Sequence, residues 1–201
     1  SYRQTACDEW PRMGVPEYFE DQQAYDAYVN WLLGNGSIRQ ASECWWGVRP
    51  AMCYPTLELR MTDACPRLAD TLCIAALFRL LVACAIEQAS PGASYSPTSR
   101  RVVQENRWRA KRFGIHGAFI VEGFDRAFSA RQWLLRAEQL YGDAAQQLIM
   151  PDVFAQARSM LDEGTSADRQ RRVYRQTLQV GADASAALVA VVDHLLADAA
   201  R

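Results

Sequence analysis

Histidine is scarce in this sequence, and paired cysteine motifs are absent from it. The chain has two histidines, His116 and His194, and its six cysteines form no C-x-x-C pair and no cluster with histidine. Zinc sites are built from cysteine and histidine at close spacing, so we expect no zinc site. Unpaired cysteines favour a reducing cytoplasm, although Cys44 and Cys53 would be able to pair if their strands are neighbours.

The sequence also lacks a strong net charge and a membrane-length apolar run. The net charge of -1 gives no general reason to expect binding to nucleic acid or to acidic membranes. The longest apolar run, from Leu72 to Ile86, has Arg79 at its centre and is shorter than the roughly 20 residues that a spanning helix needs. We therefore predict a core helix here and no membrane partner. The polar N-terminus shows no signal peptide.

The composition is typical of a globular chain with one domain. Half of the 201 residues are hydrophobic, which is enough for a substantial core. The pattern predicts an irregular segment over 1–19, antiparallel strands near 44–48 and 56–62, and a small hairpin around 118–127. It predicts helices over 21–33, 66–87 and 99–113, a linker over 89–98 between the last two, and four more helices that begin near Ser129, Pro151, Ser166 and Asp183.

The strand at 56–62 carries the polar pattern with the most chemistry. Apolar residues alternate here with Glu58, Arg60 and Thr62, so one face of the strand presents a carboxylate and a guanidinium. One interpretation is a solvated face with a weak surface ion pair. The other is a site that holds a metal with Glu58 and an anion with Arg60.

The helix expected over 99–113 is strongly basic, with one acidic residue, Glu105. One interpretation is a solvated face whose aliphatic stems cover the core, and the other is a nucleic-acid-binding helix. His116, just after this helix, is either a surface hydrogen-bonding group or a catalytic base. His194 lies off the apolar stripe of the last helix and is expected to be exposed. That stripe consists of Leu188, Val191, Val192, Leu195 and Leu196.

Three segments in this order carry a resemblance to a known family: Trp45-Trp46-Gly47-Val48-Arg49-Pro50, Thr56 to Asp63, and Glu105 to Gly114. Together they resemble the carboxylate–amine ligases of the glutamate–cysteine ligase type 2 family. The resemblance implies an α+β fold, in which the antiparallel sheet of a glutamine-synthetase-like catalytic domain is backed by helices and followed by an all-helical part. Residues 1–201 would be the C-terminal half of that single domain, strand-rich over about 40–65 and helical over about 66–201.

The resemblance implies an ATP-dependent ligase that forms an amide or γ-glutamyl bond through an acyl-phosphate. Its substrates would be amino acids, glutamate and cysteine for preference, and its cofactors ATP and Mg²⁺. Glu58 would be the metal ligand, and Arg60 and Arg49 would be catalytic. The nucleotide or substrate would be bound by Arg3, Trp46, Asn106 and Arg107.

Two departures from the family pattern affect this prediction. The family's first metal-binding carboxylates and its H-x-H segment have no equivalent here, so the chain is expected to begin within a longer protein and to be inactive without the N-terminal half. Relatives can carry His-Trp-Asp where this chain has Trp45-Trp46-Gly47. Two alternative functions remain open: a non-catalytic member of the family and a nucleic-acid-binding module. A homodimer also remains open as the oligomeric state.

Overall fold

The structure, a computed structural model, describes residues 2–88 and 97–200. The chain divides into two compact units. The first comprises Ser1–Asp63 and Ser94–Lys111, and the second comprises Ala64–Ala93 and Arg112–Arg201. Most of the predicted linker at 89–98 lies outside the described residues.

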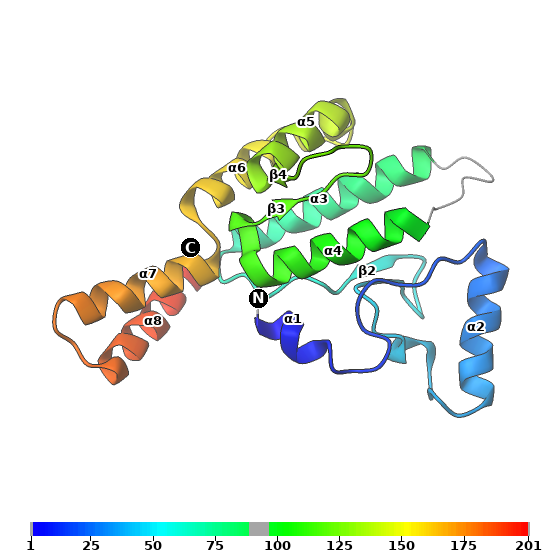
Figure 1. The fold of residues 1–201 in the computed structure, drawn as a ribbon, viewed down its shortest axis with the longest axis horizontal. Coiled ribbons are helices and arrows are strands. Elements are labelled where there is room, and N and C mark those ends of the chain that lie inside the picture. The colour runs from blue at the N-terminus through cyan, green and yellow to red at the C-terminus, as the bar shows by residue number, and fades with distance from the viewer. Residues whose placement is uncertain (1, 89–96, 201) are drawn as a thin grey trace. The chain divides into compact units, whose positions relative to one another are not determined.

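Helices make up most of the described chain, and the strands are short (Figure 1). The strands form two antiparallel pairs, β1 with β2 and β3 with β4. This mixture agrees with the predicted α+β class, while the glutamine-synthetase-like arrangement stays a prediction. The elements are α1 (Tyr2–Cys7), α2 (Gln22–Gly34), η1 (Ala41–Glu43), β1 (Val48–Pro50), β2 (Leu57–Leu59), α3 (Leu68–Glu87), α4 (Pro97–Phe113), η2 (Gly114–His116), β3 (Ala118–Phe119), β4 (Phe128–Ser129), α5 (Ala130–Gln147), α6 (Val153–Glu163), α7 (Ser166–Gln179) and α8 (Ala184–Ala199).

The first unit contains the predicted antiparallel pair, in a shorter form. Val48 pairs with Leu59, and Pro50 pairs with Leu57. Pro50 has no amide hydrogen to donate, and one further backbone bond follows it, from the amide of Ala51 to the carbonyl of Thr56 at 2.9 Å. At the other end, the amide of Arg60 donates to the carbonyl of Gly47 at 2.7 Å. The prediction of antiparallel pairing is confirmed, but both strands are shorter than predicted and the first is shifted to Val48–Pro50, so that Arg49 and Pro50 lie in the strand and not in the loop that follows it.

The prediction that residues 1–19 are irregular is wrong in part, because Tyr2–Cys7 form helix α1. The helix is held by contacts with a distant part of the chain: the side-chain amide of Gln4 donates to the carbonyl of Met61. Gln4 is buried there. A helix of six residues is too short to show a hydrophobic period, so this contact was not visible in the sequence.

The core of the first unit forms around α2. The helix predicted over 21–33 is confirmed, and Asp21 caps it, since its carboxylate accepts from the amide of Ala24 at 2.8 Å. The buried core residues are Val29, Leu32, Ile38, Cys44 and Trp46. Cys44 and Cys53 are both free thiols, so the disulfide left open by the sequence is absent.

The core of the second unit lies where α3 packs against α5 and α6 (Figure 1). Cys73, Leu80 and Cys84 face this core, which confirms the prediction of a core helix. The prediction that α3 is covered almost all round is wrong, because Leu72 and Ile86 are 59% and 71% exposed. By length and composition alone α3 would be able to span a membrane, a criterion that core helices also meet.

Helices α7 and α8 form the C-terminal part of the second unit and pack on each other. The predicted helix start near Ser166 is confirmed, and a capping box begins α7, with Thr165 as its capping residue. The predicted helix start near Asp183 is confirmed, and the Asp183 side chain caps α8. The predicted apolar stripe of α8 is largely outside the core, since Leu188, Val192 and Leu196 are exposed.

Both histidines lie in this unit and pair with aspartates. His116 is exposed, and its Nε2 lies 3.1 Å from Oδ1 of Asp168. This supports the surface hydrogen-bonding interpretation. His194 is half-buried, with Nε2 3.6 Å from Asp198 Oδ2, so the expectation that it is exposed was wrong. Its position one turn before the buried Asp198 explains the difference.

Candidate functional site

The polar face of the β1–β2 pair joins Arg49 to Glu58. The two residues are direct partners across the ladder. Nε and Nη2 of Arg49 donate to Oε2 of Glu58 at 3.0 and 2.8 Å. Nη1 of Arg49 donates to the carbonyls of Ser42 and Cys44. Each of the three guanidinium nitrogens of Arg49 thus has an acceptor within the protein, and the side chain is buried.

Arg60 lies beside the carboxylate of Glu58, and Arg3 contacts the backbone just after β2. Nη1 of Arg60 is 3.7 Å from Oε2 of Glu58, while its buried Nε has no acceptor among the described residues. Arg3, on α1, donates to the carbonyls of Arg60 and Thr62 at 3.5 and 3.3 Å. The fold thus gathers four predicted site residues: Arg3, Arg49, Glu58 and Arg60.

These residues do not by themselves form a magnesium site. Magnesium is held by several oxygen ligands, and two guanidinium groups already face the single carboxylate of Glu58. Among residues 2–88 and 97–200, no three histidine, cysteine or acidic side chains gather in a way that would hold a metal. The metal role of Glu58 stays a prediction, and no chemical step is derived through a metal here.

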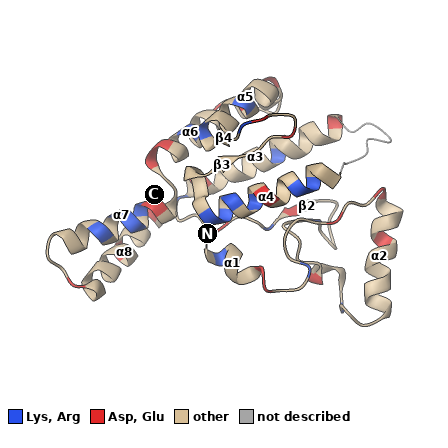
Figure 2. Cartoon of the chain, in the orientation of Figure 1, with Lys and Arg blue, Asp and Glu red and all other residues tan. Residues whose placement is uncertain are grey.

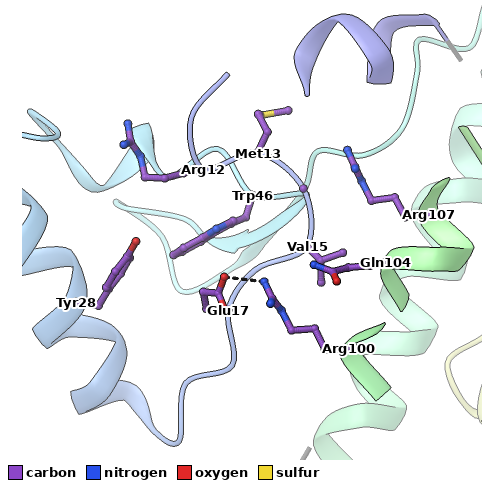
Figure 3. Close-up of a pocket in the computed structure, with 10 residues that line it drawn as sticks. Arg12, Met13, Val15, Glu17, Tyr28, Trp46, Arg100, Gln104 and Arg107 are labelled. Carbon is purple, nitrogen blue, oxygen red and sulfur yellow. Dashed lines mark hydrogen bonds and ion pairs between the residues drawn. The ribbon is translucent and has the colours of Figure 1, made fainter. Parts of the chain in front are cut away.

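A second feature of the first unit is a pocket of about 260 Å³ beside Trp46. Its wall is formed on one side by α4 and on the other by the segment 12–17 (Figure 3). Arg100, Gln104 and Arg107 occupy successive turns of α4 and share one face of it. The lining has three guanidinium groups, from Arg12, Arg100 and Arg107, and one carboxylate, from Glu17.

Trp46 and Arg107, both predicted to bind nucleotide or substrate, meet at this pocket. Trp46 is 4% exposed and stacks on Tyr28, with ring centroids 6.1 Å apart. Arg107 is oriented by Gln4, whose Oε1 accepts from Nη2 at 3.1 Å, and by the carboxylate of Asp8. Asn106 is the next residue on α4 and is half-buried, but it does not line the pocket.

Asp8 is the carboxylate that holds the basic side of this site. It pairs with both Arg107 and Lys111. Burial raises the pKa of Asp8, but the hydrogen bonds from Arg107 and Lys111 outweigh it and leave the pKa below its ordinary value. The charged form of Asp8 is therefore favoured in the folded state.

Several residues of the pocket were not singled out as site residues from the sequence. The spacing of Arg100, Gln104 and Arg107 was a usable signal, because it places them on one helix face. Asp8, Arg12 and Glu17 gave no signal, since they lie in a segment predicted to be irregular and approach α4 only through the fold. The remaining basic residues of α4 lie along the rest of the helix (Figure 2).

Comparison with known proteins places the chain in a family. The model of glutamate-cysteine ligase family 2 matches residues 1–190. A relative from Pseudomonas fluorescens is 45% identical over 196 residues, which are 98% of this chain and 50% of the relative. One from Ectopseudomonas mendocina is 43% identical over 201 residues, 98% of this chain and 52% of the relative. A third relative, from Pseudomonas entomophila, is 41% identical over 199 residues, which are 98% of this chain and 51% of the relative.

All three relatives carry the name “Putative glutamate–cysteine ligase 2”. The chain spans about half the length of these curated relatives. The family model, in contrast, covers nearly the whole of this chain. The chain belongs to glutamate–cysteine ligase family 2.

Proposed function

We propose that the chain is part of an ATP-dependent carboxylate–amine ligase that joins the carboxylate of glutamate to an amine such as cysteine. The observation that carries the proposal is the family match over residues 1–190. The names of the relatives, which mention glutamate and cysteine, support this choice of substrates. A cytoplasmic location and a requirement for magnesium are part of the proposal, with no magnesium ligand set assigned.

The chemistry of such a ligase explains why arginines are expected at the site. A carboxylate does not react with an amine until it is activated, and ATP activates it by forming an acyl-phosphate. The transferred phosphoryl group spreads negative charge over its oxygens, so fixed cations around it lower the barrier. Guanidinium groups suit this task because they stay charged and donate to oxygens in a planar fork.

Arg60 is our candidate for contact with the phosphoryl or acyl-phosphate oxygens. It lies at the end of the short β1–β2 ladder, its side chain is 30% exposed, and its Nε has no acceptor among the described residues. We assign Arg49 a positioning role, since its three nitrogens already bind Glu58 and backbone carbonyls. Arg3 stabilises the same strand end through its two carbonyl contacts.

The test is ADP release by the protein at its natural full length, with ATP, magnesium, glutamate and cysteine, followed by a panel of other amines. We expect release that requires both the carboxylate and the amine. Arg60→Gln should lower kcat by roughly 100-fold or more, a magnitude typical of removing one group that stabilises transition-state charge. Arg101→Gln, on the exposed part of α4, is the matched control and should keep the activity.

The contradicting result is equally specific. No ADP release with any pair of substrates, from a folded full-length sample, would exclude the ligase activity for those substrates and favour a non-catalytic member of the family. Magnesium-independent retention on DNA or RNA that falls steeply with salt would favour the nucleic-acid-binding alternative.

A further inference from the structure

Helix α8 has an exposed apolar face. Within the described chain, the element that it packs on extensively is α7, where its buried Asp198 binds Arg169. The opposite side of the helix is open to solvent, and its residues Leu188, Val192 and Leu196 are 59%, 55% and 66% exposed. Single exposed apolar side chains are normal on a protein surface, but a row of them along a whole helix marks an interaction site.

The exposed residues of α8 are spaced as in a helix that packs on another helix. They follow one another at alternating steps of four and three residues, which is the seven-residue repeat of a coiled-coil seam. This period keeps one stripe of side chains facing a partner helix along the whole length of the contact. The stripe, which we call the α8 seam, consists of Ser185, Val189, Val192, Leu196 and Ala199, and Leu188 lies beside it.

The pair of helices α7 and α8 resembles one half of a four-helix bundle. The two helices run antiparallel and are joined by the short turn at residues 180–183 (Figure 1). Two helices that pack only on each other bury one face each, so the α8 seam stays in water in a single copy. In a four-helix bundle a second antiparallel pair covers such faces. A second copy of this chain would bring an identical pair of helices.

The charges of α7 and α8 allow this pair of helices to pack on an identical surface. Residues 166–199 hold equal numbers of basic and acidic side chains, and none of these belongs to the α8 seam. Two copies therefore carry no net charge that would keep them apart at this surface. A strongly charged partner, in contrast, has no excess of opposite charge to recognise here. The four arginines are Arg169, Arg171, Arg172 and Arg175, and the four aspartates are Asp168, Asp183, Asp193 and Asp198.

An antiparallel arrangement of two copies matches the seam with itself. Val192 is the middle member of the seam, so a two-fold axis there places Ser185 of one copy opposite Ala199 of the other. The same axis places Leu188 opposite Leu196. Large side chains thus meet in the centre and small ones at both ends. The positive end of each helix dipole then lies near the negative end of the other, which favours this arrangement.

We propose that the α8 seam is the contact surface between two copies of this chain, related by a two-fold axis near Val192. The inference does not depend on the ligase proposal. A helix of 16 residues is about 24 Å long and about 10 Å wide, so the seam offers each copy a contact of roughly a few hundred Å². This area is small for a specific interface, so we expect a reversible dimer with a dissociation constant in the micromolar range.

The first test is analytical ultracentrifugation of the protein at its natural full length, over a range of concentrations. We expect a monomer–dimer equilibrium that is roughly 100-fold weaker in Val192→Glu, because this change brings two carboxylates together in an apolar contact. Val180→Glu is the matched control, since Val180 is an exposed valine in the turn between α7 and α8, outside the seam. It should dimerise as the wild type does, and thermal unfolding of both variants checks that the fold is kept.

The second test determines the arrangement of the two helices by disulfide formation, in a parent that carries Cys53→Ser because Cys53 is an exposed thiol. A disulfide forms only where two Cα atoms lie within about 7 Å of each other. With oxidised glutathione, Val192→Cys should link to its own copy, because this position lies at the axis. Ser185→Cys and Ala199→Cys should each stay unlinked alone and should link to each other when the two variants are mixed. The parent without an added cysteine is the control and should stay unlinked.

Four outcomes would overturn the proposal. These are a monomer at about 1 mM protein, an equal loss of dimer in Val192→Glu and Val180→Glu, a dimer that Val192→Glu leaves unchanged, and a link between two copies of Ser185→Cys. The third result would assign the dimer to another surface and leave the seam to a different part of the full-length protein. The last would mean that the helices pair in parallel. None of these measurements involves ADP release, so failure here is separable from failure of the ligase proposal.

Discussion

Arg169 and Asp70 are 99 residues apart in the sequence and form a buried ion pair, with Nη2 of the arginine 3.1 Å from Oδ2 of the aspartate. Both side chains are almost completely buried. Nε of the same arginine donates to Asp198 at 3.2 Å, and Nη1 donates to the carbonyl of Gly164 at 2.8 Å. One guanidinium thus joins the beginning of α3, the end of α6, and α8.

Replacing this arginine should destabilise the second unit strongly. Arg169→Leu removes the arginine partner of the buried Asp70 and one of the two arginines that pair with the buried Asp198, and breaking a buried pair from one side costs about 3–5 kcal/mol. We expect that loss in the free energy of unfolding measured with urea. Arg175→Leu, at an exposed position of the same helix, is the matched control and should change it by about 0.5 kcal/mol or less. Equal urea midpoints for the two variants would contradict the prediction.

Substitution by alanine should have opposite effects on stability at Gly47 and at Gly142. A Cβ at Gly47 would lie 2.2 Å from Cγ of Met61 and 3.2 Å from the carbonyl oxygen of Gly14, so Gly47→Ala should destabilise by about 1–3 kcal/mol. A Cβ at Gly142, within α5, would meet nothing within 4 Å. Gly142→Ala should therefore stabilise by about 0.5–1 kcal/mol. Thermal unfolding of both variants checks the two signs, and a shift in the same direction would show the structural distinction to be wrong.

The free cysteines should differ widely in their reaction with a thiol reagent. Cys53 is exposed, whereas Cys44 and Cys73 are buried, and burial raises the pKa of both buried thiols. Because the thiolate is the reactive form, these two should react only slowly in the native state. Native labelling with Ellman's reagent should show a fast phase that Cys53→Ser reduces. An unchanged fast phase in that variant would contradict the assignment.

Asp8 should make the first unit sensitive to acid. Its pKa is lowered in the folded state, so the stabilisation is present above its ordinary value of 3.8 and is lost as pH falls through the lower, folded-state value. The free energy of unfolding of the wild type should decrease below about pH 4, and that of Asp8→Asn should decrease less. Glu9→Gln, which changes an exposed neighbouring carboxylate, should keep the wild-type slope. Parallel pH profiles for the wild type and Asp8→Asn would contradict the prediction.

Local patterns in the sequence predicted the elements that depend on neighbouring residues. The helix starts predicted at 21, near Ser129 and near Asp183 are confirmed, because each start is fixed by a cap made within one helical turn. The hairpin predicted around 118–127 is present with its second strand shifted, since β3 pairs with β4 at Phe128–Ser129, just beyond the predicted range.

The parts that were missed depend on contacts between distant segments. Helix α1 is stabilised by the contact of Gln4 with Met61, and the pocket depends on Asp8, Arg12 and Glu17 approaching α4. The hydrophobic periodicity of a sequence carries no information on which distant segments come into contact. The exposed face of α3 was missed for a related reason, since an apolar run shows that a helix is hydrophobic and not which of its faces are covered.

The close approach of Gly47 to Met61 also has an evolutionary consequence. The two positions share one volume, because the side chain of Met61 occupies the space that any Cβ at residue 47 would need. In the lineages of this family, a substitution that adds a side chain at the position of Gly47 is therefore tolerated only after, or together with, a change at the position of Met61. We expect the two alignment columns to covary, with methionine at the second position confined to sequences that have glycine at the first.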